Sequence, residues 1–331
     1  MNLQSPLIQP LHLDQFKVIR DVIEDYRKKE FGKILNWFIG GFVVAIVSAI
    51  WNIINNVNSD LGGLVGGLFL CVIFPIVAAW QIDKNYREFF STMLIPELIK
   101  RFNMQHDVEL QYSILSGISQ STFESCGLFR HPNKYKSTEL LNGKIGKTQF
   151  QCASVLAQEV RQNIYGHNRK DTVTIFSGLF FIADSNKNFN GTTFVIPDAV
   201  EALLGQTGHS LRELFARHRF GRCELVSMED PNFERNFAIY STDQIEVRYL
   251  LTPLLMQQIL AIRNKWNCPI HIAFIYGKLF MGIDTPQNWF EPPSVFTSVS
   301  AEVIQLAHHK ILMMLSLVDQ LGLNTRIWGR T

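Results

Sequence analysis

The chain has 331 residues, of which 47% are hydrophobic, and it carries 31 Lys and Arg against 29 Asp and Glu. A formal net charge of +2 provides no general field that would attract nucleic acid, so we expect no nucleic-acid partner. The cysteines form no C-x-x-C pair and lack zinc spacing with histidine, which indicates a reducing compartment without a disulfide framework. They are Cys71, Cys126, Cys152, Cys223 and Cys268.

The first segment of the chain has an amphipathic pattern. Apolar Phe16, Ile19, Ile23 and Tyr26 recur at helical spacing among charged residues. We predict that residues 1–33 form an amphipathic cytosolic lead-in helix that continues toward the apolar stretch behind it.

Two apolar stretches follow, residues 34–54 and 61–80, and neither contains Lys, Arg, Asp or Glu. At about 1.5 Å of rise per residue, about 20 helical residues cross the roughly 30 Å hydrocarbon core of a bilayer. Only residues 55–60 separate the stretches, so the sequence predicts a transmembrane helical hairpin over residues 34–80. Two buried helices of a large soluble core are the alternative.

The cations that flank the hairpin predict its orientation. They precede the first stretch and follow the second, whereas the connecting turn has none. By the positive-inside rule, both chain ends then face the cytoplasm. The flanking cations are Lys17, Arg20, Arg27, Lys28, Lys29 and Lys33 before the hairpin, and Lys84, Arg87, Lys100 and Arg101 after it.

Four glycines in the second stretch are candidates for helix–helix packing. Gly62 and Gly66 form one small-xxx-small pair, and Gly63 and Gly67 form another that overlaps it. Each pair places two glycines on one helix face and permits close approach of a second backbone. We interpret this face as the packing surface between the two helices of the hairpin, and an oligomerisation face of a homo-oligomer is the alternative.

Behind the hairpin, residues 81–145 are predicted to be a helical connector, bent at Pro96, and residues 146–331 an α+β cytosolic domain. Val, Ile, Phe and Thr predict strands over residues 148–159 and 171–184. Asn190-Gly191 is a hairpin-turn signal before a strand at 192–196. A helix over 198–215 and strands over 223–228 and 237–241 complete this part.

The last third of the chain has clear capping signals. Asp243 caps a short helix that runs to Tyr249, and Thr252 caps a second helix with Pro253 at its first position. A hairpin with Gly277-Lys278 as its turn follows over residues 270–283, and a helix over 301–321 closes the domain. Strands and helices in mixed order predict an α+β fold rather than a doubly wound parallel sheet.

Catalytic and metal-binding motifs are absent from the sequence. Residues 143–148 resemble a phosphate-binding loop, but Leu141 occupies the position where that motif needs its first glycine. We interpret these residues as a turn that leads into a strand. His308 and His309 point about 100° apart on a helix and do not share a metal. We therefore assign no catalytic residue, metal ligand or cofactor.

The densest basic cluster outside the hairpin lies near residue 217. In a domain that rests on a bilayer, Arg212, Arg217, Arg219 and Arg222 are candidate contacts for anionic lipid headgroups. A solvated helix end is the alternative.

Several blocks of sequence, taken together, resemble an uncharacterised bacterial family catalogued as domain of unknown function 3137. Their order and spacing cover most of residues 145–331. The resemblance implies no activity, cofactor or catalytic residue. The blocks are residues 176–184 with Lys187, Gly191 and 195–198; residues 228–241 with 246–256; residues 270–283 with 290–292; and residues 323–328.

From these features we expect a membrane-anchored, non-enzymatic interaction module that presents its domain to the cytosol and recruits a protein or anionic-lipid partner. A membrane-tethered, hydrolase-like enzyme with an unrecognised site is one alternative, and a secreted bacterial effector at a host membrane is another. We expect an integral protein of the bacterial inner membrane, with a host-cell membrane as the alternative location.

Overall fold

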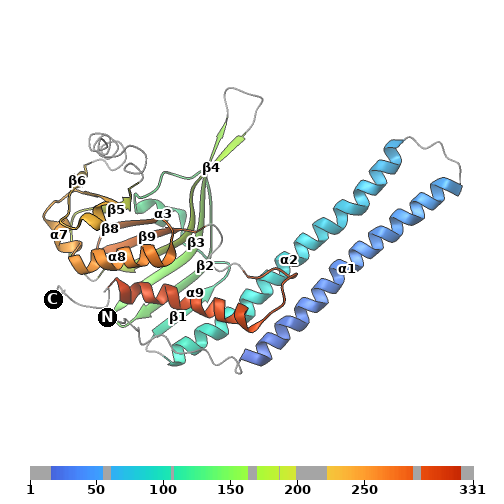
Figure 1. The fold of residues 1–331 in the computed structure, drawn as a ribbon, viewed down its shortest axis with the longest axis horizontal. Helices are drawn as coiled ribbons and strands as arrows, with labels where there is room; N and C mark the ends of the chain where they lie inside the picture. The colour runs from blue at the N-terminus through green and yellow to red at the C-terminus, as the bar shows by residue number, and fades with distance from the viewer. Residues whose placement is uncertain are drawn as a thin grey trace. The chain divides into compact units, whose positions relative to one another are not determined.

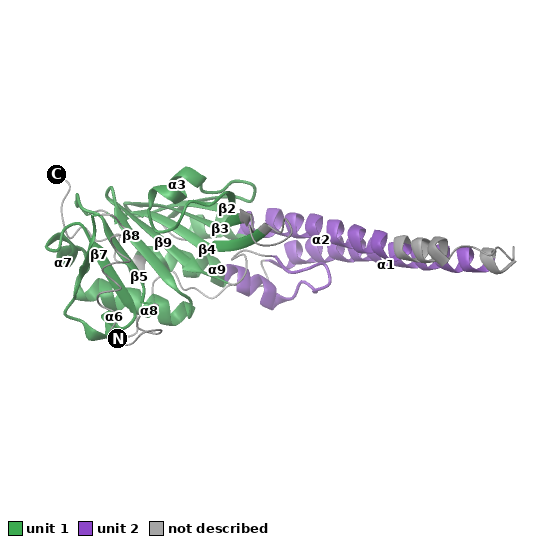
Figure 2. Ribbon diagram, turned by 90° about the horizontal axis from the view of Figure 1, so that it is seen from above, with its two compact units in different colours: residues 1–9, 98–290, 309–331 green, residues 10–97, 291–308 purple. Residues whose placement is uncertain are grey.

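The computed structural model describes residues 16–54, 61–105, 108–162, 170–185, 187–198, 222–285 and 292–321. Its contacts divide the chain into two compact units, which Figure 2 colours separately. Described residues of unit 1 fall within Leu98–Phe290 and His309–Thr331, and those of unit 2 within Pro10–Glu97 and Glu291–His308.

Unit 1 is built on a nine-stranded sheet in which all neighbouring strands are antiparallel (Figure 1). The strand order is β1-β2-β3-β4-β9-β8-β5-β7-β6. This mixture of helices with an antiparallel sheet confirms the α+β class. The strands are β1 (Val108–Ser113), β2 (Lys134–Ile145), β3 (Thr148–Gln162), β4 (Lys170–Asp184), β5 (Thr193–Pro197), β6 (Glu224–Val226), β7 (Phe237–Ser241), β8 (Ile270–Ile275) and β9 (Lys278–Asp284).

Helices cover both faces of this sheet, with α3 on one face and α8 and α9 on the other (Figures 1 and 2). Central strands must then be apolar on both sides, and Leu179, Phe180 and Phe181 of β4 are all fully buried although they alternate between faces. The helices of this part are α3 (Gln120–Ser125), α6 (Pro231–Glu234), α7 (Glu246–Leu250), α8 (Pro253–Trp266) and α9 (Ala301–Gln320).

Phe123 of α3 fills the centre of the first face. Its ring lies 5.1 Å from that of Phe129 and 5.0 Å from that of Phe180, measured between centroids. Ser119 caps the helix by accepting a hydrogen bond from the Thr122 N–H. One short helix therefore supplies the aromatic centre of this face, and the small Ala153, Ala157 and Ala273 of the strands leave room for it.

The second face of the sheet lies against α8 and α9. The Cys152 thiol of β3 lies 3.5 Å from the Met314 sulfur of α9. Thr252 caps α8 through the Leu255 N–H, and Pro253 is its first residue, as the sequence predicted. The buried stripe of α8 consists of Leu255, Met256, Ile259, Leu260, Ile262 and Trp266.

The predicted hairpin near residue 277 is formed by β8 and β9, but its turn lies one residue earlier than expected. Tyr276 and Gly277 occupy the turn with φ of 55° and 72°. Positive φ at both central residues matches the twist of an antiparallel hairpin. Tyr276, rather than Lys278, is therefore the residue held in the left-handed conformation.

Two other predictions of local structure are wrong. Residues 81–145 are not a helical connector throughout, because α2 ends at Gln105 and β1, α3 and β2 follow. Asn190-Gly191 does not connect a hairpin, because β4 pairs with β3 and β9 whereas β5 pairs with β7 and β8. The predicted helix over 198–215 lies outside the described residues.

The polar sequence of β1 suits its place at the edge of the sheet. The Asn103 side chain at the end of α2 accepts a hydrogen bond from the Leu110 N–H (2.9 Å) and donates one to the Leu110 carbonyl (3.0 Å). The amide thus takes the place of a neighbouring strand residue. Such covering of an edge strand limits pairing with other chains.

In unit 2, α1 (Lys17–Ile54) and α2 (Leu61–Gln105, up to Glu97) lie side by side and antiparallel (Figure 2). The Tyr26 and Phe89 rings stack with centroids 4.0 Å apart, and those of Trp37 and Phe74 are 5.3 Å apart. Gly41 permits the close approach, since a Cβ there would lie 2.8 Å from the Cys71 carbonyl oxygen. These contacts define a helical hairpin, and the lead-in helix continues into it without a break.

Residues 292–299, here called the strap, bind to both helices of this hairpin near its base. The Val295 N–H donates to the Asp83 carboxylate of α2 (2.7 Å), and the Val295 carbonyl accepts from the Arg27 guanidinium of α1 (3.0 Å). The Glu24 carboxylate accepts from the Val299 N–H (3.0 Å) and Arg87 donates to the Pro292 carbonyl (3.0 Å). Both helices thus bind main-chain groups of the same short segment.

The four charged side chains that bind the strap form two ion pairs, one on each helix of the hairpin. Arg27 lies 2.7 Å from Glu24 on α1, and Arg87 lies 2.6 Å from Asp83 on α2. The hydrogen bond from Arg27, together with that from the Val299 N–H, lowers the pKa of Glu24 from 4.5 to about 2. Burial alone would raise the pKa of Asp83, but hydrogen bonds from Ser294, Arg87 and Val295 outweigh it and leave that pKa below its ordinary value.

Two described helices are long and apolar enough to cross a membrane, α1 over Lys17–Ile50 and α9 over Ala301–Val318. Only 6% of the most apolar window of α1 is buried, against 44% for α9. Met314 of α9 packs on the sheet, so α9 has the character of a core helix and α1 does not.

Replacing Phe123 with Ala should lower the free energy of unfolding by about 3–5 kcal/mol, because it removes a fully buried ring from the centre of one face. Leu115→Ala is the control, since Leu115 is 79% exposed and its loss should change stability by less than about 0.5 kcal/mol. Urea unfolding of both variants measures the difference. Equal stability of the two would contradict the assigned role of α3.

Acid should loosen the strap. Because the pKa of Glu24 is lowered on folding, its contribution to stability is complete above about pH 4.5 and is lost as the pH falls toward 2. The protection of the Val299 amide against hydrogen exchange, corrected for intrinsic rates, should fall over this range. Glu24→Gln should lower that protection already at neutral pH, whereas Glu88→Gln, on an exposed side chain, should not. Unchanged protection down to pH 2 would refute the assignment.

Candidate functional site

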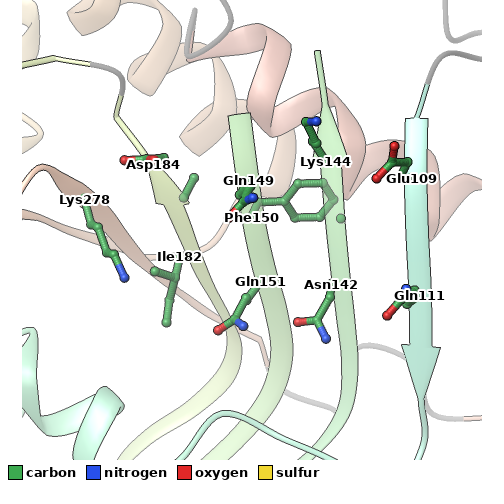
Figure 3. Close-up of a pocket in the computed structure, with 12 residues that line it drawn as sticks. Glu109, Gln111, Asn142, Lys144, Gln149, Phe150, Gln151, Ile182, Asp184 and Lys278 are labelled. Carbon is green, nitrogen blue, oxygen red and sulfur yellow. The ribbon is translucent and has the colours of Figure 1, made fainter. Parts of the chain in front are cut away.

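A polar hollow of about 350 Å³ lies on the sheet face that carries α3, over β1, β2, β3, β4 and β9 (Figure 3). Cys152 of β3 packs on α9. Side chains along a strand alternate between the two faces, so Gln149 and Gln151 point to the face opposite α9. The polar side chains of the hollow are Glu109, Gln111, Asn142, Lys144, Gln149, Gln151, Asp184 and Lys278.

The strand register arranges these side chains in cross-strand rows. Gln111, Asn142 and Gln151 are direct neighbours on β1, β2 and β3, and Ile182 of β4 continues their row. Opposite charges face one another, with Glu109 beside Lys144 and Asp184 beside Lys278. Pairs of this kind stabilise neighbouring strands.

The hollow is rich in hydrogen-bonding groups. Its amides both donate and accept, and the buried Oδ1 of Asn142 has no hydrogen-bond partner among the described residues. The opposite charges balance, so an uncharged polar ligand fits better than an ion. In the described part of the chain, no group of three His, Cys, Asp or Glu side chains could hold a metal ion.

A second pocket, here called the α7 pocket, has a volume of about 530 Å³. It lies between the segment after β4 and helix α7. Polar and apolar side chains both line it, namely Lys187, Asn188, Asp243, Ile245, Glu246, Tyr249 and Leu250.

Two carboxylates of the α7 pocket bind backbone N–H groups. Glu246 accepts from the Asn190 N–H (2.8 Å) and the Gly191 N–H (2.7 Å). A Cβ at Gly191 would lie 2.4 Å from the Glu246 carboxylate, so glycine is required for this close approach. Asp243 accepts from the Ile245 and Glu246 N–H groups at the start of α7, and these bonds lower its pKa. The sequence predicted Asp243 as the cap of this helix. The carboxylate does bind the first N–H groups, but α7 begins at Glu246 and Ile245 occupies its N-cap position.

Lys187 is the cation of the α7 pocket. Its ammonium donates a hydrogen bond to the Leu250 carbonyl (3.2 Å). Burial lowers the pKa of Lys187, and the side chain forms no ion pair with any described carboxylate. A half-buried cation that forms no ion pair with a described carboxylate is a candidate for ligand binding.

A histidine–carboxylate pair on β8 and β9 is a feature that sequence reasoning missed. The Nε2 of His271 lies 3.2 Å from the Asp284 carboxylate, and its ring packs against Phe129 with centroids 5.2 Å apart. Pairing of β8 with β9 brings these residues together, although they are distant in the sequence. Burial, together with the nearby Asp284 carboxylate, raises the pKa of the Cys268 thiol. A raised pKa disfavours the reactive thiolate, so we assign no catalytic role to this arrangement.

The candidate lipid contacts are only partly described. Arg222 is exposed at the turn before β6. Arg212, Arg217 and Arg219 lie outside the described residues, so their grouping stays a prediction. Gly62, Gly63, Gly66 and Gly67 belong to the backbone of α2, but their surroundings lie outside the described part.

Residues 174–323 match the model of a family described as "Protein of unknown function (DUF3137)", so this part of the chain is a domain of that family. The resemblance drawn from the sequence blocks is thereby confirmed over these residues. A comparison with curated proteins gives no match. Among solved structures, the chain is similar to the crystal structure of the mycobacterial trehalose monomycolate transport factor A, TtfA, with a TM-score of 0.34 and 8% identity over 66% of this chain and 93% of that chain.

Replacing Glu246 with Ala should release the segment before β5. The Asn190 and Gly191 amides lose their acceptor, so their hydrogen exchange should accelerate about tenfold or more. Glu229→Ala is the matched control, because Glu229 is exposed and forms no hydrogen bond with a described residue. Equal exchange in the two variants would show that Glu246 does not hold this segment.

Proposed function

We propose that the protein is a membrane-anchored binding module, in which the α1–α2 hairpin spans a bilayer and the α+β domain binds a protein partner at the cytoplasmic side. No catalytic arrangement among the described residues favours an enzyme over this role. The candidate binding surfaces are the polar hollow and the α7 pocket.

The observation that carries the proposal is the exposed apolar surface of the hairpin. Such a surface is unfavourable in water and favourable in hydrocarbon. The residues of α1 and α2 that form it have no ionisable neighbours within residues 34–54 and 61–80. Its exposed members include Leu35, Phe38, Ile39, Phe42, Val43, Val44, Ile46, Val47 and Ile50 on α1, and Val72, Ile73, Phe74, Ile76 and Val77 on α2.

The flanking cations support the cytoplasmic placement of the domain. Lys28, Lys29 and Lys84 lie just outside the apolar stretches, and the short segment between the stretches has no cation. A reporter that is active only outside the cytoplasm, fused after Thr331, should therefore stay silent. Strong activity of this fusion would reverse the proposed orientation.

Arginine in the apolar surface should weaken membrane insertion. Each Arg near the centre of a spanning helix costs roughly 2.5–3.5 kcal/mol, so Phe42→Arg combined with Val47→Arg should move much of the chain into the carbonate-extractable fraction. Val18→Arg is the control, since Val18 is 75% exposed on α1 but lies before the apolar stretch. If the double variant resists extraction as the wild type does, α1 does not span the membrane.

A further inference from the structure

We propose that the α7 pocket binds an acidic side chain of the partner protein, with Lys187 as the cation that receives the carboxylate. This inference rests on the proposed binding role and names the chemistry of the partner. The ligand class is a peptide segment in which Glu or Asp is flanked by apolar residues.

The first argument is the unused bonding capacity of Lys187. An ammonium has three donors, and one of them reaches a described acceptor, the Leu250 carbonyl. Burial of a cation is costly unless an anion compensates it. An incoming carboxylate would supply the missing charge and accept the remaining N–H groups.

The second argument is that the acids of the pocket itself do not fill this role. Each oxygen of Glu246 accepts a backbone N–H, one from Asn190 and one from Gly191. Asp243 accepts two N–H groups at the start of α7. Both carboxylates are held by local structure, and neither forms an ion pair with Lys187.

The third argument is the apolar rim of the pocket. Ile245 is 71% exposed and Tyr249 is 60% exposed, and both line the α7 pocket. Apolar side chains on either side of an acidic residue could cover them and exclude water from the charged contact. A volume of about 530 Å³ lies within the range of sites that bind small ligands or a few side chains.

The same residues favour a peptide over a lipid surface. Asp243 and Glu246 place two negative charges at the pocket. A single carboxylate can contact Lys187 without contacting either of these acids. The dense charge of an anionic leaflet would approach both acids at once and be repelled. Lys187 is thus suited to one acidic side chain.

The test uses the full chain in detergent micelles and two capped peptides, acetyl-Leu-Glu-Leu-amide and acetyl-Leu-Gln-Leu-amide, followed by ligand-observed NMR titration. The glutamate peptide should bind at least about tenfold more tightly, because only it can form the charged contact. Lys187→Met should abolish this preference and Lys187→Arg should retain it. Lys265→Met, a change at an exposed lysine of α8, should leave it intact.

Three results would overturn the inference. The first is equal binding of the two peptides, and the second is an unchanged preference in Lys187→Met. The third is that neither peptide binds although the Asn190 and Gly191 amides are protected from hydrogen exchange, which shows that the pocket is folded. The lipid alternative is tested in the same sample by adding phosphatidylglycerol or phosphatidylcholine to the micelles. If phosphatidylglycerol alone displaces the glutamate peptide, and Lys187→Met removes its binding, the pocket belongs to lipid and the inference is likewise overturned. Loss of membrane insertion would instead refute the anchor and leave the peptide result readable.

Discussion

Burial of the central strands on both faces is the constraint on which the rest of unit 1 depends. β4, β9 and β8 form the middle of the sheet. Phe181, Met281 and Ile272 are buried on one face, and Phe180, Phe280 and Ala273 are buried on the other. Strands of this kind cannot lie against water on either side, so both faces need helices. On one face the covering helix α3 has only six residues, and the polar hollow of that face is lined by strand residues alone.

The two candidate binding surfaces occupy different parts of unit 1. The polar hollow lies over β1, β2, β3, β4 and β9 on the face that carries α3, and its amides and paired charges can face solvent at little cost. The α7 pocket lies at the end of β4, where the chain leaves the sheet and Glu246 holds its backbone. One surface has opposite charges in cross-strand pairs, whereas in the other the acids bind backbone N–H groups and Lys187 forms no ion pair with them. This difference is why the second suggests a charged partner.

Sequence reasoning predicted the elements whose hydrophobic pattern and caps agree, such as the Thr252 cap of α8 and the strand at 237–241. It missed β1 and β2, because strands with polar faces carry little hydrophobic signal and Glu139 interrupts β2 at a bulge with φ of 63°. The α7 pocket could not be predicted either. Lys187, Asn190 and Glu246 each have an ordinary local explanation, and only the tertiary fold brings Glu246 to the distant backbone that it binds.

The strap determines how the hairpin can move. Because one residue, Val295, is bound through its N–H by α2 and through its carbonyl by α1, neither helix can slide along the other without breaking a charged contact. Spanning helices adapt to a thinner or thicker bilayer by tilting or kinking. If the hairpin spans a membrane as proposed, its two helices would therefore tilt together, and the strap that binds them both would move with them.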